Sequence, residues 1–206
     1  MEESNFINFG VKETSAPLIV MMHGRGSNEE SLANLAHSIS SKNRIISLRG
    51  PIQLGPDSYT WFQNRGIGRP IPESLRQSLE WFYKFINSEN SKGSPTALVG
   101  FSGGAAFAGA VALDKRINLS GTAILYGTIP FNAGLATEEA SLANQKIFVA
   151  QGSDDKVMPA DLMTKTWNYL HNESGAELEA HRSLGGHEIT SDVAINLNKW
   201  INRVIN

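Results

Sequence analysis

Two kinds of segment alternate along this chain, and that alternation constrains its fold more than any other feature. Short, nearly continuous apolar runs are typical of strands that are buried on both faces of a parallel sheet. Between them, apolar residues recur at helical spacing. The runs are Pro17 to Met22, Arg44 to Leu48, Thr96 to Phe101, Thr122 to Gly127 and Lys146 to Gly152.

The helical segments cover residues 29–40, 105–113, 159–171 and 189–205, with a further helix beginning at Pro72. Ser27 and Glu30 have the spacing of a capping box, which predicts that the first helix begins beside them. His181 lies in a further predicted strand. Alternating strands and helices predict an α/β fold with a mostly parallel central sheet and helices on both faces.

The length and composition favour one domain over residues 1–206. A chain of 206 residues with 41% hydrophobic content buries one substantial core. Its 18 basic and 20 acidic residues form no basic face, so we expect no nucleic-acid partner. Because the chain has no cysteine, it forms no disulfide and offers no thiolate nucleophile or ligand.

The amino-terminal stretch "MEESNFINFGVKE" is acidic and lacks the apolar centre of a signal peptide. No later run approaches the roughly 18 apolar residues that a membrane span needs. We therefore expect a cytoplasmic protein without integral membrane association.

The segment Gly100–Gly104, "GFSGG", matches the G-x-S-x-G motif, and Ser102 is its serine. An apolar strand precedes the motif and a helix of small residues follows it, which is the context of a nucleophile elbow. Such a turn holds the serine at sparsely populated backbone angles and needs small neighbours. A structural Gly-Ser turn is the alternative interpretation.

A serine hydroxyl needs a base to remove its proton, and His187 is the candidate. It lies in "LGGHEI", a loop between a predicted strand and the last helix, where a surface histidine is the alternative. Asp154 and Asp155 follow the fifth apolar run, and either could orient the imidazole while the other caps a helix. The order serine, aspartate, histidine is that of α/β-hydrolases.

The segment His23–Gly26, "HGRG", directly follows the first apolar run. Acyl transfer places negative charge on a carbonyl oxygen, and backbone N–H groups stabilise that charge. The amides of Arg25 and Gly103 are the candidate donors of this oxyanion hole. A glycine-rich turn without a ligand is the alternative, and we interpret His23 as support for the loop.

Together, "MMHGRGSNEESLANLA", "GFSGG", "GSDDKVMP" and "GGHEI" resemble the phospholipase/carboxylesterase family of α/β-hydrolases, which includes acyl-protein thioesterases. The resemblance covers Pro17 to about Ile189 and implies the α/β-hydrolase fold. It also implies that Ser102 is the nucleophile, that His187 is the base and that Asp155 is the triad acid. The implied oxyanion hole consists of the amides named above.

The chain departs from the family at two places. Gly103 stands where the family commonly has Gln, so the backbone donor remains but a side chain that shapes the pocket is absent. The segment Gly50–Pro72 is similar to the family only in "LRGP" and in the pair Trp61 and Phe62. Tyr59 and this pair are candidates for an apolar wall at the substrate, or for packing within the domain.

These observations predict a serine carboxylesterase with a minimal lid or none. It would hydrolyse short-chain carboxylic esters or thioesters, which are small molecules, through a Ser-His-Asp triad and an acyl-enzyme intermediate. The mechanism requires no metal and no organic cofactor. A lysophospholipase or other α/β-hydrolase activity is one alternative, and a non-catalytic binding protein of the same fold is another. The oligomeric state, a homodimer included, stays open.

Overall fold

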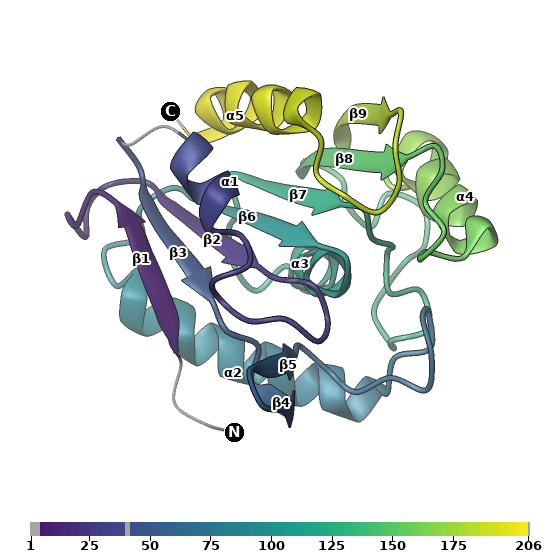
Figure 1. Cartoon of the computed structure of the whole chain (residues 1–206), viewed down its shortest axis with the longest axis horizontal. Helices are drawn as coiled ribbons and strands as arrows, with labels where there is room; N and C mark the ends of the chain where they lie inside the picture. The colour runs from purple at the N-terminus through teal and green to yellow at the C-terminus, as the bar shows by residue number, and fades with distance from the viewer. Residues whose placement is uncertain (1–4, 40–41, 206) are drawn as a thin grey trace.

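A seven-stranded sheet forms the centre of the molecule (Figure 1). The computed structural model describes residues 5–39 and 42–205. The strands lie in the order β1-β3-β2-β6-β7-β8-β9; β1 is antiparallel to β3, and the other neighbouring pairs are parallel. Their bounds are β1 Phe6–Gly10, β2 Leu18–Met22, β3 Arg44–Leu48, β6 Thr96–Phe101, β7 Gly121–Leu125, β8 Lys146–Gly152 and β9 Glu177–Ser183.

Helices cover both faces of this sheet. The helices α2 (Pro72–Glu89) and α3 (Gly103–Asp114) pack on one face, and α1 (Ala33–Ser38) and α5 (Ser191–Ile205) pack on the other. After β8, α4 (Ala160–Asn168) continues as a π-helical turn, η1 (Tyr169–Glu173). The predicted α/β-hydrolase architecture, a mostly parallel sheet between two helical layers, is confirmed.

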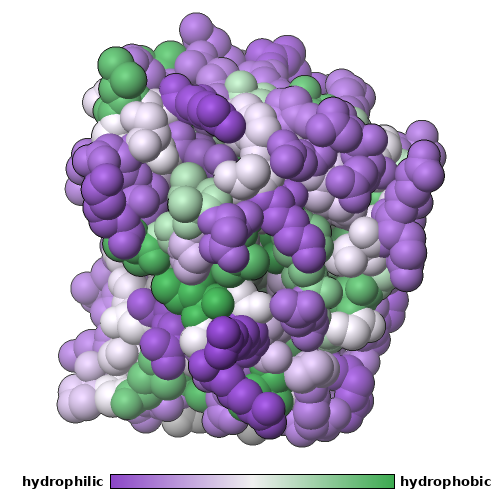
Figure 2. Space-filling model, turned by 90° about the vertical axis from the view of Figure 1, so that its right-hand side faces the viewer, coloured by the Kyte–Doolittle hydropathy of each residue, from purple (hydrophilic) through white to green (hydrophobic). Residues whose placement is uncertain are grey.

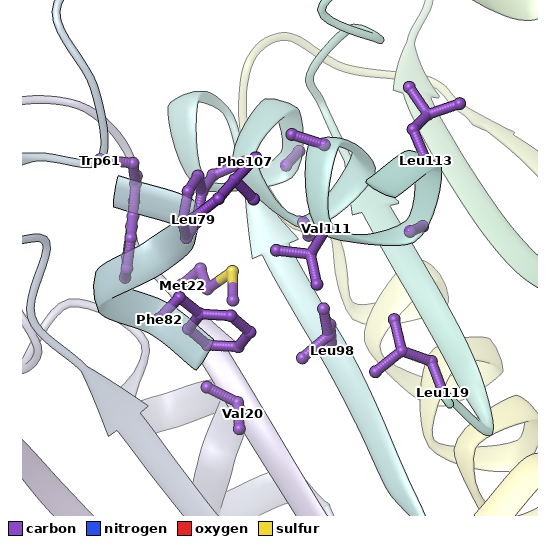
Figure 3. Close-up of a cluster of buried hydrophobic side chains, with 14 of the residues drawn as sticks. Val20, Met22, Trp61, Leu79, Phe82, Leu98, Phe107, Val111, Leu113 and Leu119 are labelled. Carbon is purple, nitrogen blue, oxygen red and sulfur yellow. The ribbon is translucent and has the colours of Figure 1, made fainter. Parts of the chain in front are cut away.

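The apolar run of strand β2 is continuous because its residues contribute to the cores on both faces of the sheet. Val20 and Met22 point to the face under α2 and α3, where Figure 3 shows them near Phe82. Ile19 and Met21 belong to the core on the opposite face. Both sides of the strand are therefore buried, and alternation with polar residues is absent.

All five apolar runs form strands; three have the predicted bounds, the other two shift by one or two residues, and the strand around His181 is β9. Three strands lack a sequence signal: β1, β4 (Ile52–Gly55) and β5 (Ser58–Thr60). The edge strand β1 is half-buried and exposed in alternation, and β4 and β5 form a separate two-stranded ribbon. Short or half-exposed strands carry too few apolar residues to stand out.

The first helix corrects one prediction. It begins at Ala33, and Leu32 before it makes no side-chain capping hydrogen bond, so the capping box of Ser27 and Glu30 is wrong. Ser27 pairs through its backbone with Tyr59 instead, whose N–H donates to the Ser27 carbonyl oxygen over 2.9 Å. This pairing holds the chain in a turn, so the helix starts later.

The start of α2 follows the prediction, because Pro72 occupies its first turn. The last helix begins at Ser191, two residues after the predicted start. Among residues 5–39 and 42–205, no helix has both the length and the apolar character that a membrane crossing requires.

Candidate active site

The carboxyl ends of the parallel strands carry the predicted site. Ser102 directly follows β6, Asp155 lies three residues beyond β8, and His187 lies four residues beyond β9. Because these strands are parallel neighbours in one sheet, their following loops meet at the same edge. Figure 2 looks onto this side of the molecule, where hydrophobic residues gather near the middle and hydrophilic residues surround them.

Ser102 occupies a strained turn between β6 and α3. Its backbone has φ 55° and ψ −115°, a combination that residues with a side chain rarely adopt. The turn requires close backbone approaches: a Cβ on Gly100 would lie 2.3 Å from the Gly104 carbonyl oxygen, and a Cβ on Gly104 would lie 2.2 Å from the Met22 carbonyl oxygen. Glycine at both positions therefore permits the turn.

Three side chains form a hydrogen-bonded row. His187 Nε2 lies 2.9 Å from Ser102 Oγ, and His187 Nδ1 lies 2.7 Å from Asp155 Oδ2. The ionised carboxylate only accepts hydrogen bonds, so Nδ1 carries the imidazole proton and Nε2 accepts from the serine hydroxyl. The side chain of Asp155 is 0% exposed and that of His187 is 14% exposed.

The two adjacent aspartates have different surroundings. Burial opposes ionisation of Asp155, but hydrogen bonds from His187 and from the N–H groups of Met158 and Val157 outweigh it and lower its pKa. Asp154 is exposed and forms an ion pair with Lys156. Only Asp155 contacts the histidine, as the resemblance implies.

The amides of Arg25 and Gly103 meet beside the serine. A Cβ built on Gly103 would lie 3.0 Å from the Arg25 nitrogen, so the two backbones are in close contact. Gly103 is the first residue of α3, where N–H groups have no helical acceptor. Within the part of the chain that the structure describes, neither amide has an acceptor. Both are available to an oxygen anion near the serine.

Buried contacts hold the loop that contains Arg25. His23 Nδ1 donates to the Gly24 carbonyl oxygen over 2.7 Å, and its Nε2 accepts from the Gly50 N–H over 3.0 Å. Trp61 Nε1 donates to the His23 carbonyl oxygen over 2.8 Å. Burial lowers the pKa of His23, and both ring nitrogens are engaged in the neutral form.

An ion pair supports the other side of this loop. Arg49 Nε donates to Glu29 Oε2 over 2.5 Å, and a second guanidinium nitrogen contacts the other carboxylate oxygen. Burial opposes ionisation of Glu29, but the hydrogen bonds from Arg49 outweigh it and lower the pKa. The Arg49 guanidinium also lies over the Tyr59 ring. The backbone carbonyl oxygen of Tyr59 accepts a hydrogen bond from the Gly26 N–H over 2.8 Å.

We call this set of contacts the loop anchor; its side chains are His23, Glu29, Arg49, Tyr59 and Trp61. Sequence analysis missed Glu29 and Arg49 as contributors to the site. The only signal for them was the "LRGP" stretch that contains Arg49, because the pair joins residues 20 apart in the chain.

Two cavities open on either side of Ser102 and Arg25. The small cavity, of about 240 Å³, is mostly apolar and includes Phe62, Ala106 and Met158 in its wall. The large cavity, of about 640 Å³, lies between α1 and the loop that leads into α5. Its wall includes His187 and several hydroxyl and amide side chains: Ser27, Ser31, Asn34, Ser38 and Ser191.

The structure separates the three aromatic residues of the predicted wall. Phe62 lines the small cavity, whereas Tyr59 and Trp61 line neither cavity. Tyr59 is 6% exposed and Trp61 is 0% exposed, because both belong to the loop anchor: Tyr59 contacts Arg49, and Trp61 contacts His23 and the core residue Phe107. For these two residues, packing within the domain is the interpretation that fits.

Two further aromatic rings support the histidine. The centroid of the His187 ring lies 5.0 Å from that of Phe101 and 6.4 Å from that of Tyr126. Tyr126 has φ 50°, and its hydroxyl lies 2.8 Å from Ser183 Oγ at the end of β9. No motif marks these contacts in the sequence.

Metal-ligating side chains are scattered. Among residues 5–39 and 42–205, no group of three or more His, Asp or Glu side chains is arranged to hold a metal ion.

Comparison with known proteins gives consistent matches. The sequence profile of the phospholipase/carboxylesterase family matches residues 6–205. The protein MhqD of Bacillus subtilis (strain 168) is 21% identical over 197 residues, which are 94% of this chain and 96% of that protein.

Solved structures resemble the whole chain in fold. A carboxylesterase of Bacillus cereus has a TM-score of 0.82 at 22% identity, covering 98% of this chain and 94% of that one. SOBER1 of Arabidopsis thaliana has a TM-score of 0.78 at 20% identity, covering 93% of this chain and 100% of that one.

Proposed function

Because the chain belongs to the phospholipase/carboxylesterase family, and so to the esterase-type hydrolases, we propose that it is a serine carboxylesterase acting on short-chain carboxylic esters or thioesters. The observation that carries the proposal is the hydrogen-bonded row. The 2.9 Å and 2.7 Å contacts connect a hydroxyl, an imidazole and a buried carboxylate in the order that nucleophilic catalysis needs.

The first half of the reaction acylates Ser102. His187 Nε2 accepts the hydroxyl proton while Oγ attacks the carbonyl carbon, and the carbonyl oxygen becomes an anion. Asp155 stabilises the imidazolium that forms. The anion accepts hydrogen bonds from the Arg25 and Gly103 amides, and the loss of one such donor costs about 10²- to 10³-fold in rate.

Collapse of this intermediate breaks the bond to the leaving group. His187 Nε2 transfers its proton to the departing oxygen or sulfur, which leaves as an alcohol or a thiol. Water then loses a proton to the same nitrogen and attacks the acyl-enzyme. The second collapse returns that proton to Ser102 Oγ and releases the carboxylic acid.

The position of His187 distinguishes the two cavities. The leaving atom must reach His187 Nε2 to be protonated, so the leaving group lies on the side of the histidine. His187 lines the large cavity and not the small one. We therefore place the leaving group in the large cavity and the acyl group in the small cavity.

The size of the small cavity supports a short acyl chain. At about 240 Å³ it has less than half the volume of the large cavity, which is about 640 Å³. The apolar side chains of Phe62, Ala106 and Met158 favour hydrocarbon over polar acyl groups. We expect butyrate-sized groups to fit and palmitate-sized groups to extend beyond the cavity.

Hydrolysis of p-nitrophenyl esters tests the proposal. The wild-type protein should release nitrophenol from the butyrate ester with a higher kcat/KM than from the palmitate ester. Ser102→Ala and His187→Ala should each lower kcat by about 10⁴- to 10⁶-fold. The same variants should fail to hydrolyse a thiobutyrate ester, measured by release of its thiol.

Two variants provide matched controls. Ser88→Ala changes an exposed serine on α2, and His181→Ala changes a histidine on β9 outside the row. Both should retain wild-type activity. Undiminished turnover by Ser102→Ala, or a fluorophosphonate label recovered on another residue, would contradict the proposed nucleophile.

A further inference from the structure

We propose that the large cavity recognises a polyol, so that the substrate is an ester of a small alcohol carrying several hydroxyl groups. This inference rests on the proposed function, because it concerns the leaving group of the same reaction. The evidence is the chemistry of the cavity wall, which combines His187 with hydrogen-bonding side chains and two opposite charges.

Short polar side chains on one helical face form part of the wall. Ser31, Asn34 and Ser38 all line the large cavity and are exposed. Their spacing of three and four residues places them on the same side of α1 and the turn before it. Because these side chains are short, they leave room for a ligand while lying within reach of it.

The hydrogen bonds of these residues determine what they offer. Ser31 Oγ donates to the Asn28 carbonyl oxygen over 3.0 Å, and Ser38 Oγ donates to the Leu35 carbonyl oxygen over 2.7 Å. Both hydroxyl oxygens therefore present lone pairs to the cavity.

The amide between these two serines completes the pattern. The Asn34 side chain has no hydrogen-bond partner among the residues that the structure describes. Its side chain offers both donors and an acceptor to the cavity. An alcohol hydroxyl both donates and accepts hydrogen bonds. It can therefore donate to the hydroxyl oxygens of Ser31 and Ser38, and it can donate to or accept from the Asn34 amide.

The charges of the cavity favour a neutral leaving group. Arg25 and Glu188 both line it, and neither forms an ion pair within the described part of the chain. The two opposite charges leave the cavity without a net charge that would favour one kind of ionic alcohol, and hydroxyl groups can form hydrogen bonds with both residues.

The apolar part of the wall fits the carbon side of such a molecule. The buried residues Leu32 and Leu35 line the cavity, and so does Phe101. A polyol presents C–H groups as well as hydroxyls. The cavity therefore matches both chemical sides of this ligand class.

Two butyrate esters isolate the leaving group. Glyceryl 1-monobutyrate and propyl butyrate share the acyl group and a three-carbon alcohol, and they differ by two hydroxyls. We expect a kcat/KM about tenfold higher for the glyceryl ester, since each hydrogen bond contributes roughly two- to tenfold. Asn34→Ala should lower this preference about fivefold.

Matched measurements make the result decisive. Asn172→Ala removes an exposed amide that lines neither cavity and should keep the wild-type preference. Butyrylcholine and 3-butyryloxypropanoate supply a cationic and an anionic alcohol, and both should be poorer substrates than the glyceryl ester. The melting temperature of Asn34→Ala should equal that of the wild type.

Three outcomes would overturn the inference: equal kcat/KM for the two neutral esters, an unchanged preference in a folded Asn34→Ala variant, or a charged alcohol as the better leaving group. In each case, Ser102-dependent hydrolysis of p-nitrophenyl butyrate would leave the proposed function standing. Absence of that hydrolysis in the wild type would overturn the proposed function and this inference together.

Discussion

The hydrogen-bonded row and the loop anchor both adjoin the proposed oxyanion hole, and they are built differently. The row joins side chains from three loops, each following a different strand, and each member contacts the next through its chemical group. The loop anchor fixes a stretch of backbone by means of an ion pair, an imidazole and an indole. Its residues need not touch a substrate.

This difference separates chemistry from positioning. A change in the row removes a group to which we assign a part in the proposed reaction, so activity should fall while the fold persists. A change in the loop anchor releases the Arg25 amide and removes buried contacts, so stability should fall and activity should fall less. The predictions below test this division, from the largest expected effect to the smallest.

The largest effect is expected for Asp155→Asn. The amide removes the charge that stabilises the imidazolium and favours the wrong tautomer of His187, which costs about 10⁴-fold in kcat. Asp154→Asn, which removes only the exposed pair with Lys156, should stay within about twofold. Steady-state kinetics with p-nitrophenyl butyrate measure both, and the reverse ranking would move the triad acid to Asp154.

Glu29→Gln tests the loop anchor. The change leaves the Arg49 guanidinium without its carboxylate, and since Arg49 is 25% exposed, we expect a loss of about 2 kcal/mol in unfolding free energy. Activity should fall about tenfold, less than the loss of a whole oxyanion donor. Urea denaturation and kcat measure the two effects.

The exposed pair of Glu73 and Arg76 supplies the control for this variant. Glu73→Gln should leave the unfolding free energy and the activity nearly unchanged, because both side chains are more than half exposed. If Glu29→Gln lowered kcat as much as Asp155→Asn, the division between chemistry and positioning would be wrong.

Trp61→Phe should have a smaller effect. The phenyl ring retains stacking on Phe107, whose ring centroid lies 5.2 Å away, but the His23 carbonyl oxygen loses its donor. We expect a loss of about 1 to 2 kcal/mol in unfolding free energy. Trp200→Phe, a similar change in the core under α5, should destabilise without lowering kcat.

The smallest effect concerns pH. In the unfolded chain His23 takes up a proton near pH 6.5, whereas burial lowers its pKa in the folded protein. The unfolded state therefore binds more protons just below pH 6.5, and the unfolding free energy falls as the pH falls. Loss of the Nε2 acceptor to protonation would also break the bond from Gly50.

Urea denaturation at pH 7.5 and pH 5.5 tests this dependence. The unfolding free energy of the wild type should be lower at pH 5.5 than at pH 7.5. In His23→Gln this difference in unfolding free energy should be smaller, by at most about 1.4 kcal/mol per pH unit. An identical pH dependence in both proteins would show that His23 is protonated in the folded state as readily as in the unfolded state.

Local patterns predicted most of the architecture. A strand such as β2, buried on both faces, is a continuous apolar run, and the elbow around Ser102 has glycines that its close backbone approaches require. The loops holding Asp155 and His187 follow strands that were themselves predictable. Strand order alone then brings these residues to one edge of the sheet.

Long-range contacts were not predictable in the same way. The turn at Ser27 depends on backbone pairing with Tyr59. Nothing in the sequence around Ser27 indicates this pairing, so the capping box was the prediction that the local sequence favoured. The pair of Glu29 and Arg49 likewise depends on which strands become neighbours. The two cavities are spaces between distant elements, so their walls have no sequence motif of their own.

Trp61 also has an optical consequence. Its indole is fully buried and hydrogen-bonded to the loop that positions Arg25, so its fluorescence reports on water entering that contact. The chain has four tryptophans, and replacing the other three by phenylalanine would leave Trp61 as the single tryptophan, close to the proposed oxyanion hole. A shift of its emission to longer wavelength would then reveal loosening of the loop before the protein unfolds.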